Sequence, residues 1–103
     1  MYKLRFVQKF ERENQERFLE IEKKFIELEK QDSSMPKGKR YLPMMGKEPT
    51  NTLVWECEFE KLSDAMKALD SIELNETHTK LLNEQCCYMV ETYNELYCTF
   101  DEE

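Results

Sequence analysis

Glycine and proline are scarce in this sequence, with two and three residues among 103. A linker, a collagen-like chain or a low-complexity segment needs many more, so these classes are excluded. No apolar run approaches the roughly 20 residues that span a bilayer, and the start, from Met1 to Phe6, lacks the apolar core of a signal peptide. We therefore expect one ordered domain over residues 1–103, in the cytoplasm, with no membrane contact.

Positive charge is also in short supply, since 15 Lys and Arg face 22 Asp and Glu and the net charge is −7. A nucleic-acid binder usually needs a basic face to displace counterions, so we expect no nucleic acid among the partners. The sequence has no glycine-rich phosphate loop and no serine or cysteine nucleophile motif, which argues against nucleotide-dependent and hydrolytic enzymes. We expect no cofactor.

The four cysteines show no Cys-x-x-Cys spacing, and there is a single histidine. A lone histidine does not supply the several ligands of a typical zinc site, so we expect no metal. The neighbours Cys86 and Cys87 point in different directions on a helix, and we interpret them as small hydrophobic residues rather than a redox pair. The acidic residues of 56–60 and of 101–103 are interpreted as a solvated strand face and a tail.

Apolar and polar residues alternate strictly from Trp55 to Glu60, within a segment over residues 51–60 that contains the only tryptophan. Such alternation predicts a strand with one buried face. A first strand beginning at Tyr2 alternates in the same way. The residues expected on the buried face of these two strands are Leu4, Phe6, Leu53, Trp55, Cys57 and Phe59.

The remaining elements follow from local patterns. An apolar stripe at helical spacing predicts a helix over about 12–30, and a loop follows at 31–39. Residues 39–45 predict a strand at the sheet edge, because Pro43 cannot donate to a central ladder. Ser63 is expected to cap one helix and Asn75 a second that runs to about Cys87. Residues 88–100 predict a last strand.

The element order is therefore β-α-β-β-α-(α)-β. This is the split βαβ, or ferredoxin-like, pattern of an α+β fold, with helices on one face of an antiparallel sheet. The first strand and the tryptophan strand are neighbours in this pattern. Lys3 and Arg5 would then lie beside Glu56 and Glu58 on the uncovered face, a favourable cross-strand arrangement. That face is either solvated or the interface of a dimer.

The central block of the sequence resembles dimeric α/β-barrel proteins of the NIPSNAP-like kind. The resemblance rests on residues 39–43 (KRYLP), residues 51–56 (NTLVWE), and Phe59 followed by a helix. It implies a homodimer formed by packing sheet on sheet. The wider superfamily includes cofactor-independent monooxygenases, haem-degrading enzymes, lactone isomerases, stress-response proteins and members without known activity, so the resemblance implies assembly better than chemistry.

Candidate site residues follow from this arrangement. Ligand pockets of the superfamily often lie between sheet and helices, so Trp55 with Tyr41 or Met45 is a candidate apolar wall for a flat ligand. Arg40 is a candidate partner for a carboxylate or phenolate of that ligand, or else a solvated edge charge. His78, near a helix N-terminus, is a candidate proton acceptor in catalysis, or else an exposed or capping residue.

Two functional hypotheses remain from the sequence. The first is a homodimer of undefined activity that binds a small apolar or aromatic molecule between sheet and helices. The alternative is a cofactor-independent monooxygenase or isomerase acting on an aromatic or polyketide-like compound, with His78 as its base. A regulatory module that binds a metabolite at a dimer interface is weaker, because such domains are generally attached to an enzyme.

Overall fold

The computed structural model describes residues 1–100, and the acidic tail discussed above lies outside the described residues. The predicted ferredoxin-like order is confirmed. The elements are β1 (Tyr2–Phe10), the 3₁₀ helix η1 (Arg12–Asn14), α1 (Gln15–Gln31), β2 (Lys39–Tyr41), β3 (Thr52–Phe59), α2 (Leu62–Leu74), α3 (Glu76–Cys86) and β4 (Met89–Cys98). No helix within residues 1–100 has the length and apolar character needed to cross a bilayer.

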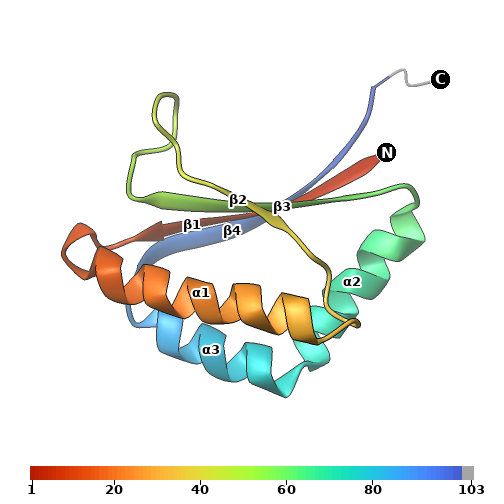
Figure 1. The fold of residues 1–103 in the computed structure, drawn as a ribbon. Coiled ribbons are helices and arrows are strands. Elements are labelled where there is room, and N and C mark those ends of the chain that lie inside the picture. The colour runs from red at the N-terminus through yellow and green to blue at the C-terminus, as the bar shows by residue number, and fades with distance from the viewer. Residues whose placement is uncertain (101–103) are drawn as a thin grey trace.

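The four strands form one antiparallel sheet in the order β2-β3-β1-β4. The three α-helices lie on one face of this sheet and leave the other, here called the outer face, uncovered (Figure 1). The edge position predicted for β2 is confirmed, but this strand ends at Tyr41 and not at Met45. Tyr41 is the last paired residue, and the chain leaves the sheet as a loop that contains Pro43 two residues later.

The predicted buried face is confirmed by the packing. Leu4 and Trp55 form a core with Met35 and Ile72, and Phe6, Cys57 and Phe59 pack against it. Phe10, Phe18 and Leu53 form a second core towards the other end of the sheet. Complete burial of an aromatic or aliphatic side chain of this size stabilises the fold by roughly 1.5–3 kcal/mol. Helix α1 contributes side chains to these cores because its apolar stripe faces the sheet.

The two predicted helix caps have different outcomes. Asn75 caps α3, because its side-chain Oδ1 accepts a hydrogen bond from the His78 amide at 2.8 Å. The cap predicted at Ser63 is wrong, since α2 begins at Leu62 and its N-cap residue is Lys61, which makes no side-chain capping bond. This first turn is exposed, so water can satisfy its free amide groups.

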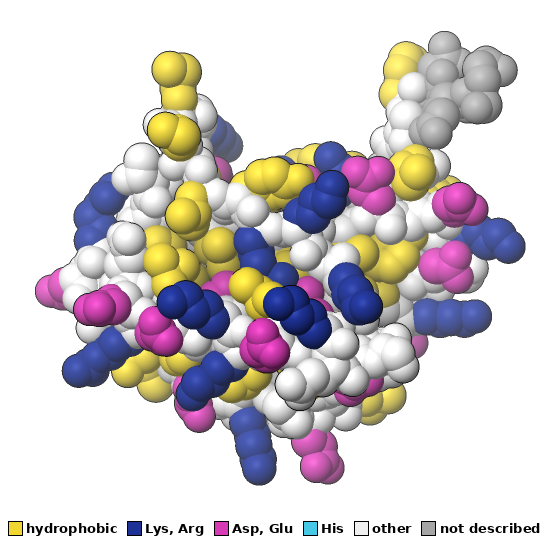
Figure 2. Space-filling model, viewed as in Figure 1, with side chains coloured by type: hydrophobic (Ala, Val, Ile, Leu, Met, Phe, Trp, Pro, Cys, Tyr) yellow, Lys and Arg dark blue, Asp and Glu magenta, His cyan; other side chains and the backbone are white. Residues whose placement is uncertain are grey.

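The outer face carries the cross-strand ion pairs that the sequence predicts. Arg5 bonds Glu56 at 2.8 Å, and Lys3 lies 3.5 Å from Glu56. Arg5 also bonds Glu95 of β4 at 2.9 Å, a pair that the sequence did not predict. The loop between β2 and β3 projects on this side, and apolar side chains gather at its tip (Figure 2). Met44 and Met45 in this loop are 92% and 96% exposed. The outer face therefore carries ion pairs around Arg5, beside a row with the buried Val7 and Val54, and is flanked by an apolar projection.

Candidate functional site

A cavity of about 660 Å³ lies between the helix-covered face of the sheet and the helices. Its inner wall consists of buried side chains, including Phe25 and Glu22 of α1, Met35 of the following loop and Trp55 of β3. Its exposed lining residues come from the other side: Met66, Asp70 and Glu73 of α2, Thr79 and Cys86 of α3, and Thr92 and Asn94 of β4. The cavity therefore opens between β4 and the helices α2 and α3.

Trp55 forms the aromatic part of the wall. The register pairs it with Phe6 on β1, and the two rings stack with their centroids 4.9 Å apart and an interplanar angle of 29°. Gly38 lies against the edge of the indole, where a side chain at position 38 would overlap the ring. The absence of a side chain at Gly38 thus fixes where the indole lies in the cavity.

The alternative interpretation of Arg40 as a solvated edge charge is wrong, because its side chain bonds two residues of α1. Its Nε donates to Glu22 at 2.7 Å, and its Nη1 and Nη2 donate to Glu29 at 3.0 and 2.5 Å. The side chains of Arg40, Glu22 and Glu29 are only 14%, 8% and 10% exposed. Burial alone lowers the pKa of Arg40, but the bonds and charges of the two carboxylates outweigh it and the net shift is upward. The guanidinium therefore stays charged.

Two further groups hold the carboxylates of this cluster in place. Glu22 accepts a bond from the Nε2 of Gln85, a completely buried residue of α3, at 2.8 Å. Glu29 accepts one from the Gly38 amide at 3.0 Å. The cluster consequently links α1, α3, β2 and the loop before β2. We call Glu22, Glu29 and Arg40 the buried ionic cluster.

His78 also lines the cavity, as the third residue of α3. Its ring lies 4.8 Å from the ring of Phe25, centroid to centroid, and burial lowers its pKa below the usual value, partly opposed by the charge of Glu29. The imidazole is therefore neutral at pH 7. Among residues 1–100, no hydrogen bond orients either ring nitrogen.

The cavity thus brings together three of the five residues singled out from the sequence, Trp55, Arg40 and His78. Tyr41 is placed elsewhere: it pairs with Val54 on the outer face and is 49% exposed. Met45 lies in the projecting loop. No group of His, Cys, Asp or Glu among the described residues has the arrangement needed to hold a metal ion.

Sequence reasoning missed Glu22 and Glu29. A signal for them exists, because they follow Phe18 and Phe25 by four residues each and so are charged residues on the same helix face as the apolar stripe of α1. Charged residues at such positions are buried only when they are paired. Gln85, equally buried, has no comparable signal.

Comparison with known proteins supports the fold. An uncharacterized NIPSNAP domain protein from Burkholderia xenovorans superposes with a TM-score of 0.78 at 10% identity, over 98% of this chain and 96% of that one. A NIPSNAP family protein of unknown function from Agrobacterium tumefaciens gives 0.75 at 16% identity, over 94% and 86%. The chain has the fold of these proteins.

The same fold occurs in a putative antibiotic biosynthesis monooxygenase from Nitrosomonas europaea, with a TM-score of 0.71 at 13% identity, over 96% of this chain and 98% of that one. No family model matches the sequence, and no curated protein does. The fold is consequently shared between proteins of unknown function and monooxygenase-like proteins. At these identities the likeness establishes architecture, and function has to be argued from the cavity.

Proposed function

We propose that this chain binds a small molecule with a flat apolar body in the cavity between sheet and helices. The observation that carries the proposal is the aromatic wall of Trp55, Phe6 and Phe25 in a cavity of about 660 Å³. Sites for small molecules are typically about 300–1,000 Å³, mostly apolar and provided with a few polar groups. The buried ionic cluster and His78 are those polar groups here.

An uncharged flat probe, 2-naphthalenemethanol, tests this proposal. Because Trp55 is the only tryptophan and lines the cavity, a bound naphthalene ring should quench and shift its emission in a saturable way. Trp55 emission that stays constant up to the solubility limit of the probe would contradict the proposal.

The neighbouring cysteines provide a matched control for the place of binding. Both thiols are exposed, but only Cys86 lines the cavity. Two triple variants share Cys57→Ala and Cys98→Ser. Adding Cys87→Ser leaves Cys86 as the single thiol, and adding Cys86→Ser instead leaves Cys87. At a probe concentration about ten times Kd, alkylation of Cys86 should slow roughly tenfold, while Cys87 keeps its rate. Equal protection of both thiols would place binding outside the cavity.

Cofactor-independent oxygenation or isomerisation is the second candidate, and His78 favours it. A neutral imidazole that lines the cavity can accept a proton from a bound compound. It ranks second because a catalytic base is normally oriented by a hydrogen bond from a further group, and among residues 1–100 no hydrogen bond orients the His78 ring. Binding alone needs no such orientation.

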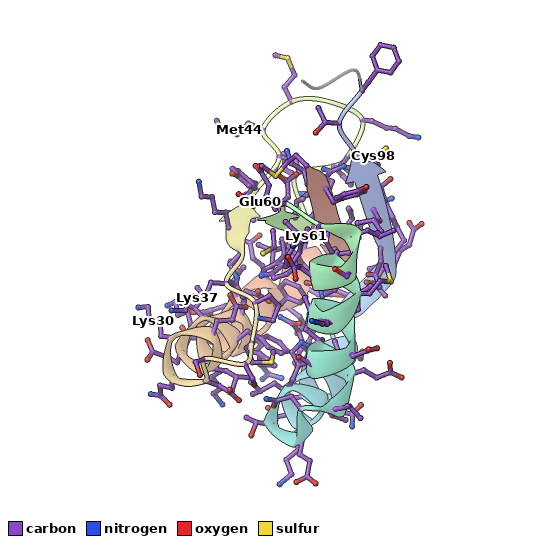
Figure 3. All side chains as sticks on the ribbon, turned by 90° about the vertical axis from the view of Figure 1, so that its right-hand side faces the viewer. Lys30, Lys37, Met44, Glu60, Lys61 and Cys98 are labelled. Atoms are coloured by element: carbon purple, nitrogen blue, oxygen red, sulfur yellow. The ribbon has the colours of Figure 1, made fainter. Side chains whose placement is uncertain are left out.

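We further propose that the outer face of the sheet packs against a second copy of this chain. The helices leave this face uncovered, and the loop carrying Met44 projects beyond it (Figures 1 and 3). Tyr41 and Tyr97 are 49% and 46% exposed on the same face. A surface of exposed aromatic residues and methionines is typical of protein interfaces.

Native mass spectrometry should therefore give a species of twice the chain mass. Met45→Glu places a charge at the tip of the projecting loop, and we expect it to shift the population to the single-chain mass. Leu74→Glu is the matched control, because Leu74 is 81% exposed at the end of α2, on the helix side of the sheet. A wild-type protein found only at the single-chain mass would contradict the homodimer.

A further inference from the structure

The buried side chains that line the cavity carry more negative charge than positive charge. Glu22 and Glu29 are about nine-tenths buried and share one guanidinium, that of Arg40. Two carboxylates against one guanidinium leave an excess of one negative charge. Burying a charge without a counter-charge is costly, so this excess favours an additional cation in the cavity.

The described residues do not supply that cation. Arg40 is the one Lys or Arg among the residues that line the cavity. His78 stays neutral, since burial lowers its pKa. The exposed lining of α2 adds Asp70 and Glu73, which are acidic as well. A ligand that enters between β4 and α2 therefore meets negative charge at the mouth and again at the buried end.

The carboxylates also retain hydrogen-bonding capacity. A carboxylate can accept about four hydrogen bonds. Glu22 accepts one from Arg40 and one from Gln85, which leaves room for further donors. The wall beside it is aromatic, with Trp55 stacked on Phe6, and aromatic faces attract cations as well as flat apolar groups.

We infer that the ligand is an aromatic or other flat apolar amine, whose cationic nitrogen meets Glu22 and Glu29 while its apolar body lies against Trp55. This inference rests on the proposed binding function and adds the charge of the ligand to it. It reverses the expectation from the sequence that Arg40 binds a carboxylate or phenolate of the ligand. Such an anionic group would meet excess negative charge, because Arg40 is already bound by two carboxylates.

Three probes of nearly equal shape test the sign of the charge. At pH 7, 2-naphthylmethylamine is cationic, 2-naphthalenemethanol is neutral and 2-naphthoic acid is anionic. Titrations followed by Trp55 emission should show the amine binding about tenfold more tightly than the alcohol, because a charge-assisted bond to a carboxylate replaces a neutral one. The acid should bind most weakly. The preference should persist in 0.5 M NaCl, since buried charges are poorly screened.

Variants locate the charge that is responsible. Glu22→Gln removes the excess negative charge and keeps a side chain of the same size, so we expect the ratio of amine affinity to alcohol affinity to fall to about one. Glu29→Gln makes the same test if Glu22→Gln does not fold. Glu27→Gln is the matched control on α1, because its side chain is 61% exposed and its charge is screened.

The outcomes separate this inference from the proposed function. Equal affinities for amine and alcohol, or tightest binding of the acid, would overturn the inference and leave the binding cavity intact. A preference for the amine that survives in both Glu22→Gln and Glu29→Gln would overturn the role of the buried ionic cluster. Failure of all three probes to bind would overturn the proposed function itself.

Discussion

Replacing Gly38 with alanine should lower the free energy of unfolding by about 2–3 kcal/mol, which is at the upper end for overpacking a core. A Cβ at this position overlaps the indole edge of Trp55. The ring cannot swing away freely, because it is 5% exposed and stacks on Phe6. Thermal unfolding should show a midpoint lower by on the order of 10 °C, and displacement of the indole towards water should move its emission to longer wavelength.

Gly46→Ala is the control for Gly38→Ala. Gly46 has a φ of 139°, which strains any other residue, but no heavy atom lies within 4 Å of the position of a Cβ there. This substitution therefore tests backbone strain alone. It should destabilise the protein without changing Trp55 emission. If Gly38→Ala unfolds at the wild-type temperature with unchanged emission, Gly38 does not determine where the indole lies.

The fold was predictable because each element carries its own local pattern. The alternation around Trp55 is enough to define β3, and the amide-capping side chain of Asn75 is enough to start α3. The errors in the predicted helix and strand boundaries occur where the local sequence pattern differs from what solvent exposure or strand pairing allows. Ser63 is a good cap by residue type, yet α2 begins two residues earlier than a cap at Ser63 predicts, and its N-cap residue Lys61 makes no side-chain capping bond. Residues 42–45 look extended, yet the pairing of β2 ends at Tyr41 and these residues lie in the following loop.

The site was only partly predictable, because it depends on strand register. Arg40 reaches the cavity since β2 pairs it with Trp55, and the same register sends Tyr41 to the outer face. Alternation alone separates the faces of these two neighbours but does not show which one faces the helices. Glu22 and Glu29 break the apolar stripe of α1, and their partner follows a loop, so sequence spacing does not reveal the pairing.

Replacing Arg40 with methionine should have the largest effect on stability. Methionine keeps most of the apolar length of the side chain but leaves Glu22 and Glu29 buried without a counter-charge. Removing one partner of a buried ion pair typically costs about 3–5 kcal/mol, and here one guanidinium serves two carboxylates. Urea unfolding at pH 7 measures this loss.

Lys39→Met is the matched control for Arg40→Met, since it removes the same charge from the neighbouring, exposed residue of β2. It should change the free energy of unfolding by less than about 0.5 kcal/mol. Adding Glu22→Gln and Glu29→Gln to Arg40→Met removes both orphaned charges, and we expect it to restore part of the lost stability. If Arg40→Met and Lys39→Met unfold at the same urea concentration, the buried ionic cluster contributes nothing to stability. The charge balance inferred for the ligand would then lose its structural basis, because carboxylates that tolerate the loss of Arg40 are not held as buried charges.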